Sequence, residues 1–279
     1  MSHVQTTFSL SERRACQTID QPRSTQRYGE QRPGIDQALS SRMNELSREN
    51  PRYGYRRVWA LLRREGWAIN KKRVLRIWRE AGLKVPQRQH KSRRLAGSSE
   101  NGIVRRRAEY PDHVWSYDFA MDGTEDGRRV KVMPVVDEYS RECLALEMER
   151  SITSEEVIDT LRRLFIERGA PKYIRSDNGP EFVARAVKRW LAISGVGTLY
   201  IEPGSPWENA YSETFISRLR DELLNREVFA NLKEAQVLAG DYHEHYNNHR
   251  PHGALGYLTP AEFAAREAEQ IESVQRLSS

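Results

Sequence analysis

Three acidic residues, each in its own local context, constrain the fold of this 279-residue chain most strongly. Asp118 lies in VWSYDFAMD, an alternating stretch whose aromatic residues favour a strand. Asp177 closes the run KYIRSD and is followed by NGPEF, where Asn, Gly and Pro turn the chain. Glu213, separated from Asp177 by 35 residues, falls in the first turn of a helix whose N-cap we expect at Asn209. Two strands and one helix can therefore bring three carboxylates together.

Converging carboxylates need cations between them. Two carboxylates about 4 Å apart repel by roughly 4 kcal/mol at an effective dielectric near 20. Oxygen ligands select hard ions such as Mg²⁺ or Mn²⁺, and two such ions can activate the attacking oxygen and stabilise the leaving oxygen in a phosphoryl displacement. The spacing alone is a weak signal, because 39 Asp and Glu residues form many such triples. The flanking contexts carry the prediction.

The distribution of charge indicates a nucleic-acid enzyme. Residues 1–109 hold 25 Lys and Arg against 10 Asp and Glu, a net charge of +15, whereas residues 110–279 hold 20 against 29, a net charge of −9. The basic N-terminal part is suited to bind a polyanion, and the acidic C-terminal part is suited to bind cations. A solvated surface would also explain a run of charge, so this feature counts only together with the others.

The basic N-terminal part predicts a helix-turn-helix. Residues 36–50 and 54–65 have amphipathic helical periodicity, Gly66 interrupts it, and Asn70 can cap a third helix, KKRVLRIWREAGL. In the third helix we expect Val74, Ile77 and Trp78 to pack inward, and a solvated helical hairpin is the alternative interpretation. The cations that we expect to contact DNA are Lys71, Lys72, Arg73, Arg76 and Arg79, followed by Arg105, Arg106 and Arg107 in a basic stretch without periodicity.

The acidic C-terminal part predicts a mixed α/β sheet. The order from residue 113 is three strands, helix, strand, helix, strand, helix, in which the first three strands form an antiparallel meander. The first helix, SEEVIDTLRRLFIERG, is expected to begin at a Ser154 cap and to stop at Gly169.

The segment DYHEHYNNHRPHGALGYLTPAEF leaves several roles open. His245 and His249 are four residues apart, a spacing compatible with a zinc pair, but no Cys or carboxylate is conveniently placed to complete the ligand set. Arg250 and His252 can contact phosphate or brace the Glu213 helix, and the sequence does not separate these roles.

Five segments occur in an order that resembles bacterial insertion-sequence transposases with a retroviral-integrase-like core, in particular the insertion sequence three family, encoded in two reading frames. The segments are PRYGYRRVWALLRREGWAINKKRVLRIWREAGL, VWSYDFAMD, KYIRSDNGPEF, SPWENAYSETFISRLRDELL and YNNHRPHGALGYLTPAEF, and the resemblance covers residues 40–265. It implies an α/β fold, with a ribonuclease H-like mixed-sheet catalytic core preceded by an all-α helix-turn-helix DNA-binding region. It assigns Asp118, Asp177 and Glu213 as catalytic residues and as ligands of two Mg²⁺ or Mn²⁺ ions. One departure is Ala120, where many relatives carry Thr, which puts substrate contacts at that position in doubt.

The resemblance also implies a domain plan and an activity. We expect a polar N-terminal segment (1–35), a helix-turn-helix domain (36–96), a basic linker (97–112), the catalytic core with C-terminal helices (113–268) and a tail (269–279). The expected activity is cleavage at the ends of an insertion sequence, followed by attack of the freed 3′-hydroxyl on another phosphodiester. The expected partners are terminal-repeat and target DNA, further copies of the chain on DNA, and the upstream-frame protein in a frameshift fusion. A metal nuclease without joining activity and a non-catalytic DNA-binding regulator are the alternatives.

Cysteine content and hydropathy predict the compartment. Cys16 and Cys143 provide no disulfide framework, and no apolar run approaches the roughly 18 residues of a membrane span. We expect no membrane association and a cytoplasmic, nucleoid-associated protein.

Overall fold

The computed structural model describes residues 6–26, 33–86, 107–176, 181–200 and 210–278. Contacts divide the chain into two units. One unit comprises Met1–Pro51 and Ile69–Lys84, and the other comprises Arg52–Ala68 and Val85–Ser279.

In the described residues of the first unit, the regular elements are all helices. The cap predicted at Asn70 is confirmed: the Asn70 side chain accepts a hydrogen bond from the Arg73 backbone N–H at 2.8 Å and caps the following helix. Val74, Ile77 and Trp78 are buried, as expected. The helices are α2 (Glu12–Thr18), α3 (Arg23–Gln26), α4 (Pro33–Glu49) and α6 (Lys71–Glu80).

The expected second helix of the helix-turn-helix, α5 (Tyr55–Arg64), groups by its contacts with the second unit. It ends just before Gly66, whose φ of +91° is a left-handed conformation that glycine adopts without strain. The break predicted at this glycine is therefore confirmed.

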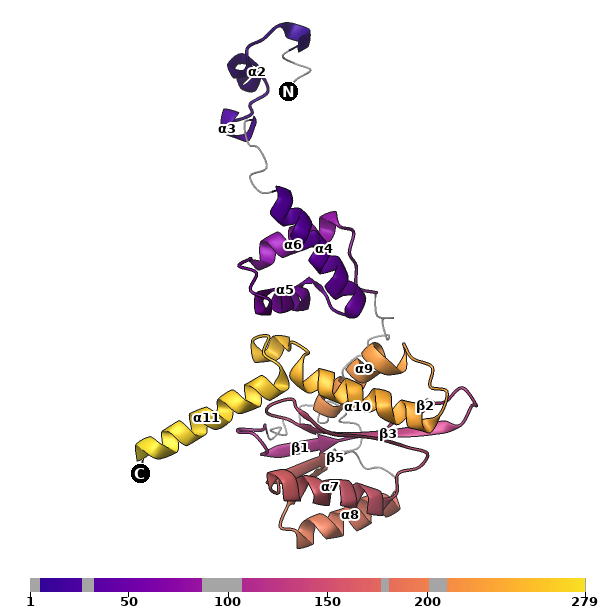
Figure 1. The fold of residues 1–279 in the computed structure, drawn as a ribbon. Helices are drawn as coiled ribbons and strands as arrows, with labels where there is room; N and C mark the ends of the chain where they lie inside the picture. Colours follow the sequence, from indigo (N-terminus) through magenta and orange to yellow (C-terminus); the bar gives the residue numbers. More distant parts are fainter. Residues whose placement is uncertain (1–5, 27–32, 87–106, 177–180, 201–209, 279) are drawn as a thin grey trace, which may run out of the picture. The chain divides into compact units, whose positions relative to one another are not determined.

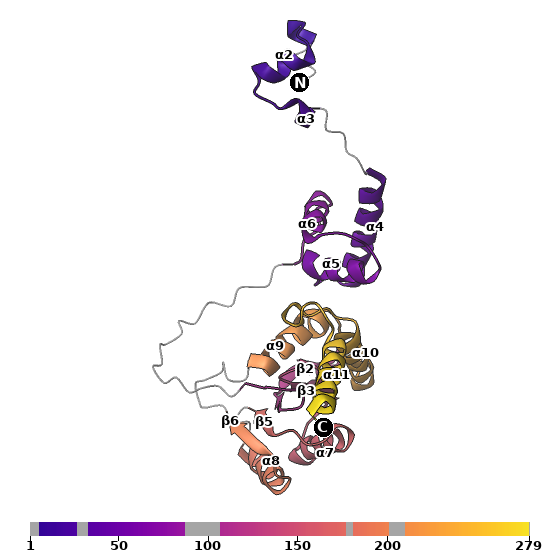
Figure 2. The same ribbon diagram turned by 90° about the vertical axis from the view of Figure 1, so that its left-hand side faces the viewer.

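The second unit contains a mixed sheet in which β3 is the central antiparallel strand. It pairs antiparallel with β1, β2 and β4, while β1, β5 and β6 run parallel in that order. Figure 2 shows β6 beyond β5, next to α8. The strands are β1 (Val114–Tyr117), β2 (Ala120–Gly123), β3 (Arg129–Asp137), β4 (Cys143–Glu149), β5 (Tyr173–Ser176) and β6 (Gly197–Tyr200).

The stretch VWSYDFAMD forms two strands instead of the single expected one. β1 and β2 pair with β3 in one continuous register, with Tyr117 opposite Val135 and Ala120 opposite Val132. The interruption falls at Asp118 and Phe119, where the Asp118 Oδ1 accepts a hydrogen bond from the Phe119 N–H at 2.7 Å. A local bond from side chain to backbone takes the place of the ladder there.

Helices cover both faces of the sheet (Figure 1). Side chains of β3 alternate between two cores: Val130 and Val132 pack under α9 and α10, whereas Met133 and Val135 pack under α7 and α8. The helices of this unit are α7 (Ser154–Arg168), α8 (Glu181–Ile193), α9 (Ala210–Leu219), the π-helical turn η2 (Arg220–Leu224), α10 (Leu232–Asn248), the 3₁₀ turn η3 (Gly253–Leu255) and α11 (Pro260–Ser278).

The sequence predicts Ser154 as the cap of α7, but the observed cap is Thr153. The Thr153 hydroxyl accepts from the Glu156 N–H, and the Glu156 carboxylate accepts from the Thr153 N–H, so the two residues form a capping box. The helix stops before Gly169, as expected, at a φ of +87°.

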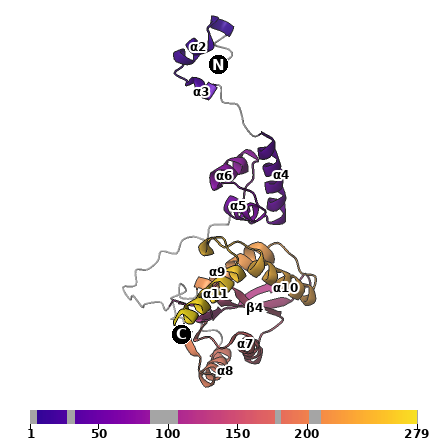
Figure 3. The same cartoon turned by 60° about the vertical axis from the view of Figure 1, so that its left-hand side comes forward.

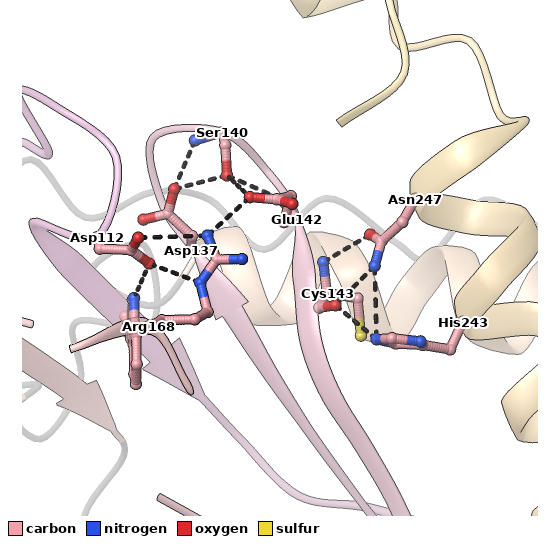
Figure 4. A network of polar contacts seen from close by, with 9 residues as sticks. Asp112, Asp137, Ser140, Glu142, Cys143, Arg168, His243 and Asn247 are labelled. Atoms are coloured by element: carbon pink, nitrogen blue, oxygen red, sulfur yellow. Dashed lines mark hydrogen bonds and ion pairs between the residues drawn. The ribbon is translucent and has the colours of Figure 1, made fainter. Parts of the chain in front are cut away.

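The C-terminal helices form side-chain hydrogen bonds with β4 and with the turn that precedes it. Asn247 of α10 accepts from the Cys143 N–H at 2.9 Å and donates to the Cys143 carbonyl at 2.8 Å (Figure 4). Figure 3 shows α10 running beside β4. The Tyr139 hydroxyl bonds Glu267 of α11 at 2.8 Å, and α11 continues to Ser278 through the range expected as a tail.

Candidate active site

Asp118 stands where β1 ends. It follows Tyr117, and its side chain is partly buried. Since its Oδ1 accepts from the Phe119 N–H, the carboxylate is held at the point where the chain leaves the strand. The orientation of this carboxylate is therefore fixed by the backbone.

Glu213 is exposed in the first turn of α9. The opposite face of the helix is anchored in the core through Phe215 and Leu219, and α9 packs against both β1 and β3. Glu213 lines a pocket of about 590 Å³ together with Ser217 and Arg218. Glu213 therefore lies on the face of the sheet where α9 packs against β1.

Asp177 lies outside the described residues, and β5 is described up to Ser176. Parallel pairing sets Ser116 of β1 opposite Arg175 of β5. The Arg175 guanidinium donates to the Glu138 carboxylate at 2.8 Å, and both side chains are buried. This ion pair ties β5 to the turn after β3, two residues before position 177.

Arg250 is fully buried, although the sequence offered it as a DNA contact. Its Nε donates to one Glu222 oxygen at 2.7 Å and its Nη2 to the other at 2.5 Å. Its Nη1 lies 3.1 Å from the His252 Nε2. The observed geometry favours bracing over phosphate contact, because Glu222 belongs to η2, the direct continuation of the Glu213 helix.

The charge states in this cluster follow from burial and pairing. Burial raises the pKa of Glu222, but the hydrogen bonds and charge of Arg250 outweigh it and hold this pKa below its usual value. Burial and then the Arg250 charge lower the pKa of His252 to about 2, so the ring is neutral and its Nε2 accepts from Arg250. Nothing in the sequence pairs Glu222 with Arg250, because 28 positions separate them.

The expected DNA-contacting cations fall into different environments. Arg73 and Arg76 both pair with Asp36 of α4, at 2.5 and 2.6 Å. Lys71, Lys72 and Arg79 are exposed on α6, and Arg107 is exposed within the range expected as the basic linker. Arg105 and Arg106 lie outside the described residues.

The rings of His245 and His249 lie 6.0 Å apart, and burial lowers the pKa of His245. In the part of the chain that the structure describes, no group of three or more His, Cys, Asp or Glu is arranged to hold a metal ion. Asp177 is not in that part.

Comparison with known proteins decides the family. Two models of the integrase core domain match residues 108–206 and 194–260, and a model of an HTH-like domain matches residues 34–91. The chain is 39% identical over 271 residues to the insertion element IS407 uncharacterized 31.7 kDa protein of Burkholderia multivorans, which covers 95% of each chain. It is 29% identical over 240 residues to the transposase InsD for insertion element IS2 of Escherichia coli, covering 81% of this chain and 78% of that one. The chain belongs to the insertion sequence three family of transposases.

This transposase is a DDE-type polynucleotidyl transferase of DNA transposition, with a ribonuclease H-like core and a helix-turn-helix-like region before it. Cores of the integrase family use divalent metal ions. Among solved structures, the HTLV-2 integrase catalytic core domain in complex with magnesium aligns at a TM-score of 0.45 and 17% identity, over 57% of this chain and 99% of that one. None of the helices in the described ranges is long and apolar enough to cross a membrane.

Proposed function

We propose that Asp118, Asp177 and Glu213 form the catalytic set of this transposase and cut and join DNA at the ends of an insertion sequence. The observation that carries the proposal is the placement of Asp118 at the end of β1 beneath α9, the helix that exposes Glu213 in its first turn. The register and the sequence support the third member: Ser116 pairs with Arg175 in parallel strands, and Asp118 and Asp177 each follow two positions later in the sequence.

The proposed residues fit a hard divalent cation, because all three offer only carboxylate oxygens. When bound, two Mg²⁺ or Mn²⁺ ions would supply Lewis-acid activation of the attacking oxygen and stabilisation of the leaving oxygen. The chain itself orients the ligands. Asp118 is held by the Phe119 N–H, and Glu213 is held by a helix whose other face lies in the core.

Two displacements would follow one another at this site. In the first, water attacks the phosphorus at an element end, the P–O bond to the 3′-oxygen breaks, and that oxygen takes a proton to become a 3′-hydroxyl. In the second, the 3′-hydroxyl loses its proton as it attacks the phosphorus of a phosphodiester in target DNA, the P–O bond to that phosphodiester's 3′-oxygen breaks, and the released oxygen takes up a proton to become a new 3′-hydroxyl. Each step exchanges one P–O bond for another, so no Ser, Tyr or Cys nucleophile is required.

The partners proposed for this reaction are the terminal repeats of the element, target DNA and further copies of the chain. The upstream-frame protein, joined in a frameshift fusion, is a further proposed partner. The basic α6 would supply contacts to DNA outside the catalytic core, through phosphate neutralisation.

The test replaces Asp118 with Asn, Asp177 with Asn, or Glu213 with Gln in the full chain. Each change removes a charge but little volume, so cleavage and joining of labelled terminal DNA in Mg²⁺ should disappear while DNA affinity persists. Asp159→Asn is the matched control, since Asp159 is exposed on α7, across the sheet. Joining at the wild-type rate in any of the three variants contradicts the assignment. Cleavage without joined products in the wild type would favour a nuclease.

A further inference from the structure

A second pocket lies beside α9, on the face of the helix next to the one that carries Glu213. Its volume is about 250 Å³, and its lining includes Arg141, Tyr211, Thr214, Arg218 and His252. We propose that it binds a phosphate of the DNA strand next to the reacting phosphodiester, and this inference rests on the proposed function of the Glu213 site.

The pocket is cationic. None of its lining residues is a carboxylate. Within the described residues, Arg141 and Arg218 form no ion pair, whereas the charge of Arg250 is balanced by Glu222 and His252 is neutral. Two guanidinium groups that form no ion pair among the described residues, in a concave site without a carboxylate in its lining, attract an anion, and the planar guanidinium fork matches phosphate oxygens.

Arg141 is held in place before any ligand arrives. It lies in the turn between β3 and β4 at a φ of +68°, a conformation that is uncommon for a residue other than glycine. The turn is fixed by Asp137, whose carbonyl accepts from the Arg141 N–H at 3.0 Å and whose carboxylate accepts from the Ser140 hydroxyl at 2.6 Å (Figure 4). Glu142 accepts from Ser140 and from Arg168, which extends the brace to α7.

The side chain of Arg141 is held as firmly as its backbone. Its Nη1 donates to the Glu138 carbonyl, and its Cζ lies 3.8 Å from the centroid of the Tyr211 ring. Tyr211 stands two residues before Glu213 in the first turn of α9. The guanidinium therefore reaches the pocket already oriented, which reduces the entropy lost on binding.

Helix geometry makes this pocket continuous with the one that Glu213 lines. Tyr211, Thr214 and Arg218 are spaced three and four residues apart and share a face of α9, and Glu213 and Ser217 lie on the adjacent face. Thr214 and Arg218 line both pockets. A strand whose reacting phosphodiester sits at Glu213 can thus cross Thr214 and place a neighbouring phosphate between the two arginines.

A purely structural role for Arg141 is the alternative, since its stacking on Tyr211 also braces α9. The two roles differ in their dependence on salt. A phosphate contact releases counterions and adds about 0.9 to the slope of log affinity against log salt concentration, or about 0.7 for a single strand, whereas a brace adds nothing.

The experiment measures this slope for the full chain with a fluorescein-labelled duplex that carries the terminal repeat flanking its own gene, with Ca²⁺ in place of Mg²⁺. We expect Arg141→Gln and Arg218→Gln each to lower the slope by about 0.7–0.9, and Arg141→Lys, which keeps the charge, to retain it. Arg162→Gln is the matched control, because Arg162 is exposed on α7 and paired only locally with Asp159. Thermal unfolding of each variant checks that the fold is intact.

An unchanged slope in Arg141→Gln, with a lowered thermal midpoint or joining rate, would overturn the proposal and leave Arg141 as a brace. The proposal would also be overturned if the pocket binds a free anion and not DNA. In that case inorganic phosphate at constant ionic strength raises the thermal unfolding midpoint of the wild type but not of Arg141→Gln, and Arg141→Gln leaves the salt slope of DNA affinity unchanged. The proposed function fails separately, if the wild-type chain gives no joining in Mg²⁺, because the slope is measured without turnover.

Discussion

At the scale of single residues, the buried cluster behind Glu213 depends on two groups with opposite charge behaviour. Arg250 stays charged because Glu222 binds it through both oxygens, whereas His252 stays neutral because it is buried beside that charge. A second proton on His252 would place two cations 3.1 Å apart in the core. The cluster should therefore be sensitive to acid.

We predict that stability falls as pH drops from 7 to 5 and that His252 causes part of this fall. In the unfolded chain His252 gains a proton below about pH 6.5, whereas in the fold it stays neutral down to about pH 2. Lower pH thus favours the unfolded chain, by about 2 kcal/mol over this range. Urea unfolding at pH 7 and at pH 5 gives the free energy of unfolding at each pH. Its decrease from pH 7 to pH 5 should be smaller in His252→Gln than in the wild type, by about 2 kcal/mol.

Asp137 acts in the opposite direction, because burial raises its pKa to about 6 and the folded state therefore gains a proton first as pH falls. Its effect is common to the wild type and His252→Gln and cancels in their difference. His249→Gln, at an exposed position, is the control and should keep the wild-type decrease. An identical decrease in His252→Gln and wild type would contradict the prediction.

Residue-level prediction from sequence succeeded where the signal was local. The Asn70 cap and the Gly66 and Gly169 stops depend on a few adjacent residues and are confirmed. The partner of Arg73 is Asp36, 37 positions away, and no local pattern could reveal it. Burial of a charged residue depends on a partner brought close only by the fold.

The pairing of Arg73 with Asp36 changes which cations of α6 should matter for DNA. We predict that Lys72→Gln lowers the salt slope of DNA affinity by about 0.9, because Lys72 is exposed. Arg73→Gln should change the slope less and lower the thermal stability more, because it leaves Asp36 with one partner fewer. Fluorescence anisotropy at several salt concentrations measures the slope. If Arg73→Gln lowered the salt slope more than Lys72→Gln does, Arg73 and not Lys72 would be the DNA contact.

At the scale of elements, the order of helices and strands followed from periodicity, but two departures lie close to the site. The strand expected across Asp118 is interrupted there, because the carboxylate bonds the next N–H. The helix that carries Glu213 widens into a π-helical turn at Arg220–Leu224, which supplies Glu222 to Arg250. Periodicity reports the average geometry of a segment, and neither departure alters the pattern of apolar residues.

The ion pair between Glu222 and Arg250 should hold this second element in place. We predict that Arg250→Met destabilises the fold by about 3 kcal/mol, because the largely buried Glu222 carboxylate then keeps only Arg57, at 3.6 Å, as an ion-pair partner. The double change Glu222→Leu with Arg250→Met should recover part of the loss, since the Glu222 charge is removed with its partner while Arg57 loses its ion pair. Denaturant unfolding of the four chains measures the coupling. Equal stability of Arg250→Met and wild type would show that the pair does not hold η2.

At the scale of the whole molecule, one chain offers one proposed catalytic set and one helix-turn-helix-like region, whereas transposition must act on two element ends. A single copy would have to release one end before it acts on the other. Two copies on paired ends avoid this, and each could bind one end through α6 while its core acts on the other.

We therefore predict that joining requires at least two copies and that their defects complement each other. A full chain with Asp177→Asn should bind DNA without joining it, and a full chain with Lys71→Gln, Lys72→Gln and Arg79→Gln should retain its carboxylates but bind DNA poorly. A mixture should recover joining of labelled terminal DNA, because the intact core of the second chain can act on an end bound by α6 of the first. Unmixed chains at the same total concentration are the controls. Full activity from a DNA-bound species whose measured mass corresponds to one protein chain would contradict the prediction, since a single chain would then handle both ends in turn.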